Sequence, residues 1–178
     1  AAIPFIVSYY PAHLVDAIFE AVSGLTTTGS EVFTGLDLLP HALRFYHQEL
    51  QFIGGLGIII LAMAVLPMLG IGGLQLSRAE TTLGGDQRLT PRVRQTARAL
   101  WFGYLSISVL CILTYHLLGM TWFDAVTDTF GTISTGGFSV HDNSFAFYHS
   151  ASINLAAVFF MFLGGTNFYL HFLLLRQR

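Results

Sequence analysis

The sequence contains the stretch Gly24-Leu25-Thr26-Thr27-Thr28-Gly29, which separates two apolar segments of unequal length. The segment before it, 11–23, is predicted to be a helix of roughly 20 Å at 1.5 Å per residue. The hydrocarbon core of a bilayer is about 30 Å thick, so this helix can enter a membrane but cannot cross it. The segment after it, 50–73, carries no charge and is long enough to span. The stretch 24–30 is therefore expected to be a loop at membrane depth.

The composition indicates an integral membrane protein. Of the 178 residues, 53% are hydrophobic and only 10% are charged, and the mean hydropathy is +0.63. A soluble domain carries about a quarter charged residues, so most of this surface is expected to face lipid. The single cysteine, Cys111, excludes a disulfide framework within the chain. The apolar start of the sequence, without a signal-peptide pattern, predicts a piece of a longer protein that begins inside a membrane helix.

A second copy of the arrangement follows later in the chain. The stretch Thr132-Ile133-Ser134-Thr135-Gly136-Gly137 comes after another short helix-like segment, 121–132, which Thr121 and Asp124 open with the pattern of a capping box. Residues of the two copies correspond with one offset and no gap. The matched pairs are Asp16 with Asp124, Glu20 with Asp128, Leu25 with Ile133, Thr27 with Thr135, and Gly29 with Gly137. Internal repeats in a membrane chain usually enclose a pathway between them.

The repeat divides the chain into two units with the same order of elements. The first unit, 1–73, holds an incomplete spanning helix, the pore helix 11–23, the filter loop 24–30 and the spanning helix 50–73. The second unit, 99–178, holds the spanning helix 99–120, the pore helix 121–132, the filter loop 133–138 and the spanning helix 153–175, which is interrupted at 164–167. Five of the eight arginines lie in or beside the linker 74–98. The positive-inside tendency places this linker in the cytoplasm, so the filter loops face outside.

The chemistry of the two loops favours a cation pathway. Non-helical backbone at membrane depth is tolerated only where protein or a water-filled cavity satisfies its polar groups. Glycine allows dihedrals that aim successive carbonyls at one axis, and such carbonyls can replace the water shell of an alkali cation. The negative C-terminal ends of the two pore helices favour a cation at the same place. The predicted ion-binding residues of this selectivity filter are Thr26, Thr27, Thr28, Gly29, Ser134, Thr135, Gly136 and Gly137. They offer no soft ligand, so a transition metal is not expected there.

These motifs resemble the Trk/Ktr/HKT superfamily of potassium transporters, and the resemblance extends over nearly the whole chain. It is carried by the stretches 16–29, 51–58, 78–80, 136–139 and 164–167. The resemblance implies an all-α integral membrane fold of repeated helix, pore helix, filter loop and helix units. Four such units surround one potassium-channel-like pore in the family, and this chain holds two of them. Because a fourfold filter cannot close from two strands, this chain alone is not expected to conduct.

The resemblance also implies a function and partners. We expect potassium uptake across the bacterial cytoplasmic (inner) membrane, as a channel or symporter with no catalytic residue and no cofactor. The expected partners are membrane lipid, a second copy in a homodimer and a cytoplasmic nucleotide-binding regulatory subunit, with no nucleic acid. Gly29 and Gly137 are implied to be filter glycines. A gating loop beneath the filter is implied at Gly164, Gly165, Thr166 and Asn167.

Several features of the sequence allow more than one interpretation. The second loop has Gly136-Gly137 where the first has Thr28-Gly29, so an equal contribution of threonine ligands is not implied. The carboxylates of the pore helices either attract cations at an outer mouth or complement helix N-termini; they are Asp16, Glu20, Asp124 and Asp128. The linker arginines contact a regulatory partner or reflect topology and lipid headgroups. The break at 164–167 is a gate or only a kink.

Two other function classes remain as alternatives. Seven histidines raise the possibility of a haem-binding redox membrane protein, but only His116 and His171 lie in or near spans, and each is alone there. An intramembrane hydrolase would use Ser139 with His141 or His149, but this polar loop lacks a convincing oxyanion frame. Absence of a Soret band in the purified protein would exclude the first alternative, and lack of labelling by a fluorophosphonate would count against the second.

Overall fold

The computed structural model describes residues 1–8, 13–65 and 91–166. This part of the chain consists of helices and loops and contains no strand. The elements in order are α1 (Ile3–Val7), α2 (Leu14–Leu25), η1 (Leu36–Leu38), α3 (His41–Val65), α4 (Pro91–Leu117), α5 (Trp122–Ile133), η2 (Ser144–Tyr148) and α6 (Ala151–Gly165).

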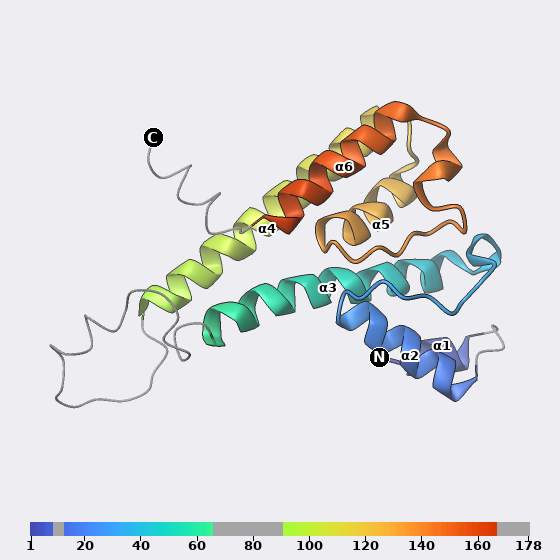
Figure 1. Ribbon diagram of the computed structural model, residues 1–178, viewed down its shortest axis with the longest axis horizontal. Helices are drawn as coiled ribbons and strands as arrows, with labels where there is room; N and C mark the ends of the chain where they lie inside the picture. Colours follow the sequence, from blue (N-terminus) through green and yellow to red (C-terminus); the bar gives the residue numbers. More distant parts are fainter. Residues whose placement is uncertain (9–12, 66–90, 167–178) are drawn as a thin grey trace, which may run out of the picture.

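The short helix α5 lies in the centre of the packing. It contacts α3, α4 and α6, while α2 packs against α3 and α1 (Figure 1). One hydrophobic core joins α4, α5 and α6 around Tyr115 and Phe160. A second core joins α1, α2 and α3 around Phe5 and Leu50. Because α3 contributes side chains to both cores, it is the element that holds the two units together.

The two half-length helices have the same length but different starts. α2 and α5 are each 12 residues long, which is about 18 Å. At the start of α5 the Thr121 hydroxyl accepts a hydrogen bond from the Asp124 backbone N–H, at 3.1 Å, so the predicted cap is confirmed. At the start of α2, His13 makes no side-chain cap hydrogen bond, and Asp16 supplies the acidic residue of the first turn.

Helix boundaries differ from the predicted ones most clearly in α2, α3 and α4. α3 begins at His41, nine residues before the predicted start of the span 50–73. Its first turns are polar in sequence, but Arg44, His47 and Gln48 are buried against the rest of the protein. α4 begins at Pro91, inside the predicted linker 74–98, because proline is compatible with the first turn of a helix. α2 begins at Leu14 and ends at Leu25. The first two residues predicted for the loop 24–30 therefore belong to the helix.

The apolar lengths of the helices bear on the predicted spans. Among the described residues, Leu100–Leu117 of α4 is the helix that is long and apolar enough to cross a membrane, with a mean hydropathy of 1.6. α6 is apolar but shorter. Parts of the predicted spans 50–73 and 153–175, and most of the linker 74–98, lie outside the described residues.

Candidate functional site: two adjacent loops above a shared cavity

The loops that follow α2 and α5 have the same backbone hydrogen bonds. In the first loop the N–H groups of Thr26, Thr27 and Thr28 donate to the carbonyls of Val22, Gly24 and Ser23 at 2.9, 3.0 and 2.9 Å. In the second loop the N–H groups of Ser134, Thr135 and Gly136 donate to the carbonyls of Phe130, Thr132 and Gly131 at 3.3, 3.2 and 3.0 Å. Each pair is shifted by 108 positions, as Thr27 is from Thr135. The repeat in the sequence is therefore also a repeat of the backbone hydrogen bonds.

The same residues in both loops have a left-handed backbone. Thr27 and Thr135 both have φ 53°, and Gly29 and Gly137 have φ 72° and 89°. A positive φ is a genuine outlier for a β-branched residue and costs roughly 1–2 kcal/mol. Backbone strain of this kind concentrates at functional sites. Two threonines with the same strain at corresponding positions indicate that the carbonyl directions of these loops are under structural constraint.

The two loops lie against each other. A Cβ atom on Gly29 would overlap the carbonyl oxygen of Gly136, and a Cβ atom on Gly137 would lie 3.8 Å from the Cα of Gly29. The first loop is braced from within, because the hydroxyls of Thr26 and Thr28 are hydrogen bonded at 2.7 Å. In the second loop the Thr135 hydroxyl donates to the Ser134 carbonyl at 2.7 Å. The predicted filter residues are thus brought together, although their hydroxyls stabilise the loops locally.

A cavity of about 180 Å³ lies beneath the two loops. It has room for several water molecules, since each occupies about 30 Å³ in the liquid. Its walls are Thr27, Ser134 and Thr135 from the loops, Ile133 from the end of α5, Gly55 and Ile58 from α3, Tyr104 from α4, and Gly164 and Gly165 from α6. Three of the residues predicted for the filter and two of those predicted for the gate therefore line the same cavity.

The end of α6 differs from the corresponding part of α3. Gly54-Gly55 of α3 corresponds to Gly164-Gly165 of α6, yet α3 continues as a helix to Val65 while α6 ends at Gly165. Thr166 is extended, with φ −83° and ψ 152°, and its hydroxyl donates to the Leu163 carbonyl at 2.8 Å. A Cβ atom on Gly164 would lie 2.6 Å from the Ile133 carbonyl oxygen, so this glycine permits close packing of α6 on the end of α5. Asn167, the last residue of the predicted gate, lies outside the described residues.

Two carboxylates of the pore helices have a role that neither sequence interpretation gave them. Glu20 and Asp128 are 0% and 1% exposed. Glu20 Oε2 accepts a hydrogen bond from the Val32 N–H at 3.1 Å, and Asp128 Oδ1 accepts one from the Val140 N–H at 3.5 Å. Both contacts are again shifted by 108 positions. Each carboxylate therefore ties the chain that leaves the loop back to its own pore helix.

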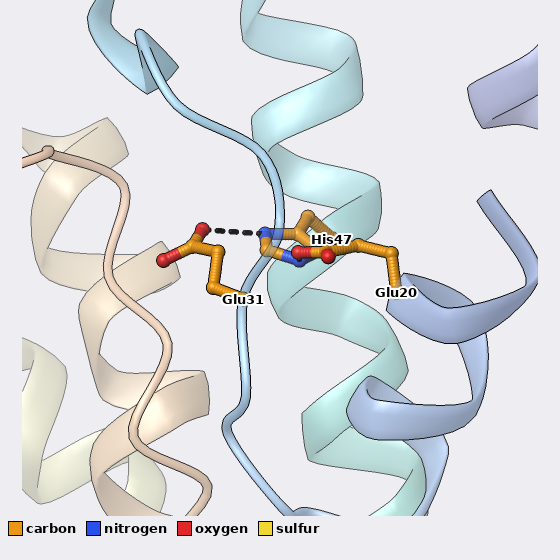
Figure 2. Close-up of side chains that lie close together, drawn as sticks. All are labelled: Glu20, Glu31 and His47. Atoms are coloured by element: carbon orange, nitrogen blue, oxygen red, sulfur yellow. Dashed lines mark ion pairs between the residues drawn. The ribbon is translucent and has the colours of Figure 1, made fainter. Parts of the chain in front are cut away.

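A cluster of three ionisable side chains joins α2, α3 and the segment that follows the first loop (Figure 2). His47 Nε2 lies 2.7 Å from Glu20 Oε1, and His47 Nδ1 lies 4.0 Å from Glu31 Oε1. Burial, together with the charges of Glu20 and Asp142, raises the pKa of Glu31 to about 8. The three possible ligand atoms lie within 4.8 Å of one another, but the imidazole is already paired with Glu20. The sequence alone does not bring these three residues together, because they lie in three separate segments of the chain.

Within the described residues, Ser139, His141 and His116 make contacts other than those that the two alternative functions would use. Ser139 receives a hydrogen bond from the backbone N–H of His141 at 3.3 Å, while the His141 ring faces Asp37 and Asp124. No serine–imidazole pair is therefore present in the described loop. The His116 ring has its Nδ1 3.1 Å from the Met120 carbonyl and stacks on Trp122. His171 lies outside the described residues.

Comparison with known proteins identifies close relatives of this chain. The model of the TrkH family, described as a cation transport protein, matches residues 3–178. The Trk system potassium uptake protein TrkH of Vibrio parahaemolyticus is 50% identical over 175 residues, which are 96% of this chain and 36% of that protein. TrkH of Escherichia coli K12 is 48% identical over 181 residues (99% and 37%), and TrkG of the same organism is 43% identical over 167 residues (92% and 34%). The chain spans about a third of the length of these relatives.

A solved structure gives the same result. The crystal structure of the potassium transporter TrkH from Vibrio parahaemolyticus matches with a TM-score of 0.78 and 48% identity, over 90% of this chain and 31% of that one. The predicted all-α membrane fold with pore-helix units and the resemblance to potassium transporters are therefore confirmed.

Proposed function

Because the chain belongs to the TrkH family of cation transport proteins, we propose that the full-length protein takes up potassium ions across the bacterial inner membrane. The ion passes a filter of backbone carbonyls to which this chain contributes two loop segments, 26–29 and 134–137. One observation carries this proposal: the two loops have the same hydrogen bonds and the same left-handed residues, and they lie side by side. Such a backbone can present carbonyl oxygens from two directions to one dehydrated cation.

The shared cavity supports a gate below the filter. The helix end at Gly164, Gly165 and Thr166, continued by Asn167, is the proposed obstruction between the filter and the cytoplasm. Its glycines line the same cavity as the loop threonines, so a movement of this segment would change the width of the path directly. The corresponding glycines of α3 lie within a continuous helix, which leaves α6 as the element with a break.

The partners are part of the proposal. Two strands do not close a filter, so the remaining strands come from parts of the full-length protein beyond this chain. The proposed assembly is a homodimer in lipid, with the filter loops outside and the arginine-rich linker 74–98 in the cytoplasm. A nucleotide-binding regulatory subunit would act on that side. Cross-linking of the purified full-length protein in lipid, with and without cytoplasmic extract, tests the dimer and the subunit.

Uptake of radioactive rubidium into liposomes that contain the full-length protein tests the transport function. Potassium, rubidium, sodium and lithium are added in turn as unlabelled competitors. Strong competition by potassium and rubidium with little by lithium is the expected result, because a carbonyl cage replaces the hydration shell of the larger ions more completely. Absence of cation-dependent uptake would contradict the proposal.

A further inference from the structure

Two glutamines of α3 are buried in an unusual way. Gln48 and Gln51 are both 0% exposed. All four nitrogen and oxygen atoms of their amides lack a hydrogen-bond partner within the described part of the chain. A buried polar group without a partner costs about 1–3 kcal/mol, and such groups in native proteins call for an explanation. Two of them on one face of one helix point to a role outside that helix.

Both side chains reach from the first unit into the second. Gln48 Oε1 and Gln51 Oε1 lie 3.0 and 3.2 Å from the position of a Cβ atom on Gly131, in the last turns of α5. The Gln51 amide also lies directly against Gly136 of the loop 134–137, where a Cβ atom would overlap it. The side chain of Gln51 therefore occupies the space behind the backbone of this loop.

The other loop fills the corresponding position with its own side chain. Thr28 corresponds to Gly136 through the shift of 108 positions, and its hydroxyl is bonded to that of Thr26 at 2.7 Å. Ser134 corresponds to Thr26, and their hydroxyls make equivalent contacts, to the Gly131 carbonyl at 3.3 Å and to the Ser23 carbonyl at 3.4 Å. The second loop therefore has the hydroxyl of Ser134 but no side chain at Gly136 to pair with it. The Gln51 side chain occupies the space that such a side chain would fill.

We propose that Gln51, supported by Gln48, is a positioning residue for the loop 134–137 and replaces the brace that Thr28 gives the loop 26–29. The Gln51 side chain packs against the Gly136 backbone, and its amide makes no hydrogen bond within the described part of the chain. It therefore supports the back of the loop by filling the space behind it while the loop carbonyls face the ion. It also carries no charge, and so it does not draw a cation away from the pore axis as a carboxylate would. This inference rests on the proposed function, because it concerns the selectivity of the same filter.

The test uses the full-length protein in liposomes and measures sodium competition relative to potassium competition for rubidium uptake. Gln51→Ala removes the side chain that fills this space, and we expect sodium competition to rise roughly three- to tenfold, because the cavity left behind the loop lets its backbone shift. Gly136→Thr alone should lose uptake because the new side chain meets Gln51. Gln51→Ala with Gly136→Thr should return the competition ratio towards that of the wild type. The hydroxyl of the new threonine can then hydrogen bond to that of Ser134, as the hydroxyl of Thr28 does to that of Thr26.

The control is Met161→Leu on α6. Met161 stands three positions before Gly164, as Gln51 stands three positions before Gly54, and its replacement should leave the competition ratio unchanged. Melting temperatures of all variants are measured in the same detergent. A lower melting temperature of Gln51→Ala with an unchanged sodium-to-potassium competition ratio would overturn the proposal, because the loop would then keep its geometry without Gln51. Equal defects in Gly136→Thr and in the double variant would also overturn it. A wild-type protein without cation-dependent uptake would instead contradict the transport function itself, and the filter inference with it.

Discussion

At the scale of single residues, the loops combine two kinds of constraint. Thr27 and Thr135 have a strained backbone with a positive φ, whereas Gly29 is a position where no side chain fits. Its φ of 72° disfavours other residues, and the carbonyl of Gly136 occupies the space of a Cβ atom. The backbone conformation and the contact between the loops therefore depend on the same glycine.

Gly29→Ser is expected to raise sodium permeation relative to potassium in the full-length protein. The new Cβ would push the two loops apart and turn their carbonyls off the common axis, at a cost of roughly 1–2 kcal/mol for the backbone alone. The measurement is the sodium-to-potassium competition ratio for rubidium uptake. Gly35→Ser is the matched control, since Gly35 has a φ of 75° but its nearest side-chain atom is 3.9 Å from the Cβ position. An unchanged ratio in Gly29→Ser would contradict a filter role for Gly29.

Glu31 gives the protein a predicted dependence of stability on pH. Its pKa rises from 4.5 to about 8 on folding, mainly through burial, so the folded state binds the proton more tightly than the unfolded state. The contribution of Glu31 to stability should therefore be fully present at or below pH 4.5 and be lost as the pH rises to about 8. In Glu31→Gln this decrease should be smaller. Melting temperatures between pH 5 and 8.5 measure it, with Glu49→Gln as control; identical slopes in wild type and Glu31→Gln would show that Glu31 is not the group responsible.

At the scale of elements, the sequence was informative about some features and silent about others. The half-length helices, the capping of α5 by Thr121 and the correspondence of the two loops follow from residue patterns, because each depends on neighbours in the sequence. The start of α3 at His41 does not, since Arg44 and His47 are tolerated inside only through partners that are distant in sequence. Gln51 could not be recognised either, because its contact with Gly136 exists only after α3 packs on α5.

The break at the end of α6 can be tested by copying the sequence of the unbroken helix. Thr166→Leu with Asn167→Gly converts the segment 164–167 to the sequence Gly-Gly-Leu-Gly found at 54–57 of α3. If the break is a gate, this change should favour a continuous helix and increase the flux of rubidium severalfold. Leu163→Ile, just before the break, serves as the control. Equal flux in the double variant and the wild type would reduce the break to a kink.

At the scale of the whole molecule, the two units are joined outside the loops by a set of polar contacts. Asp142 Oδ1 accepts hydrogen bonds from the backbone N–H groups of Gly35 and Leu36 at 2.8 and 3.1 Å. His141 Nδ1 lies 2.5 Å from Asp37 Oδ1, and this contact lowers the pKa of Asp37. Because these residues are more than 100 positions apart in the chain, the contacts fix one unit relative to the other, and no local pattern in the sequence predicts them.

Asp142→Ala is expected to weaken this junction and lower the melting temperature of the full-length protein. It removes two hydrogen bonds to a charged acceptor, and the loss should be about 1–3 kcal/mol, since such bonds contribute about 1.5–3 kcal/mol each when buried and less when exposed. The loops 26–29 and 134–137 lie between the same two units, so the competition ratio for sodium should rise together with the loss of stability. Asn143→Ala, at the next position, changes the same exposed turn without removing these bonds. A destabilised Asp142→Ala protein that keeps the wild-type ratio would show that the loops are positioned by α3 and α5 alone, independently of the outer junction.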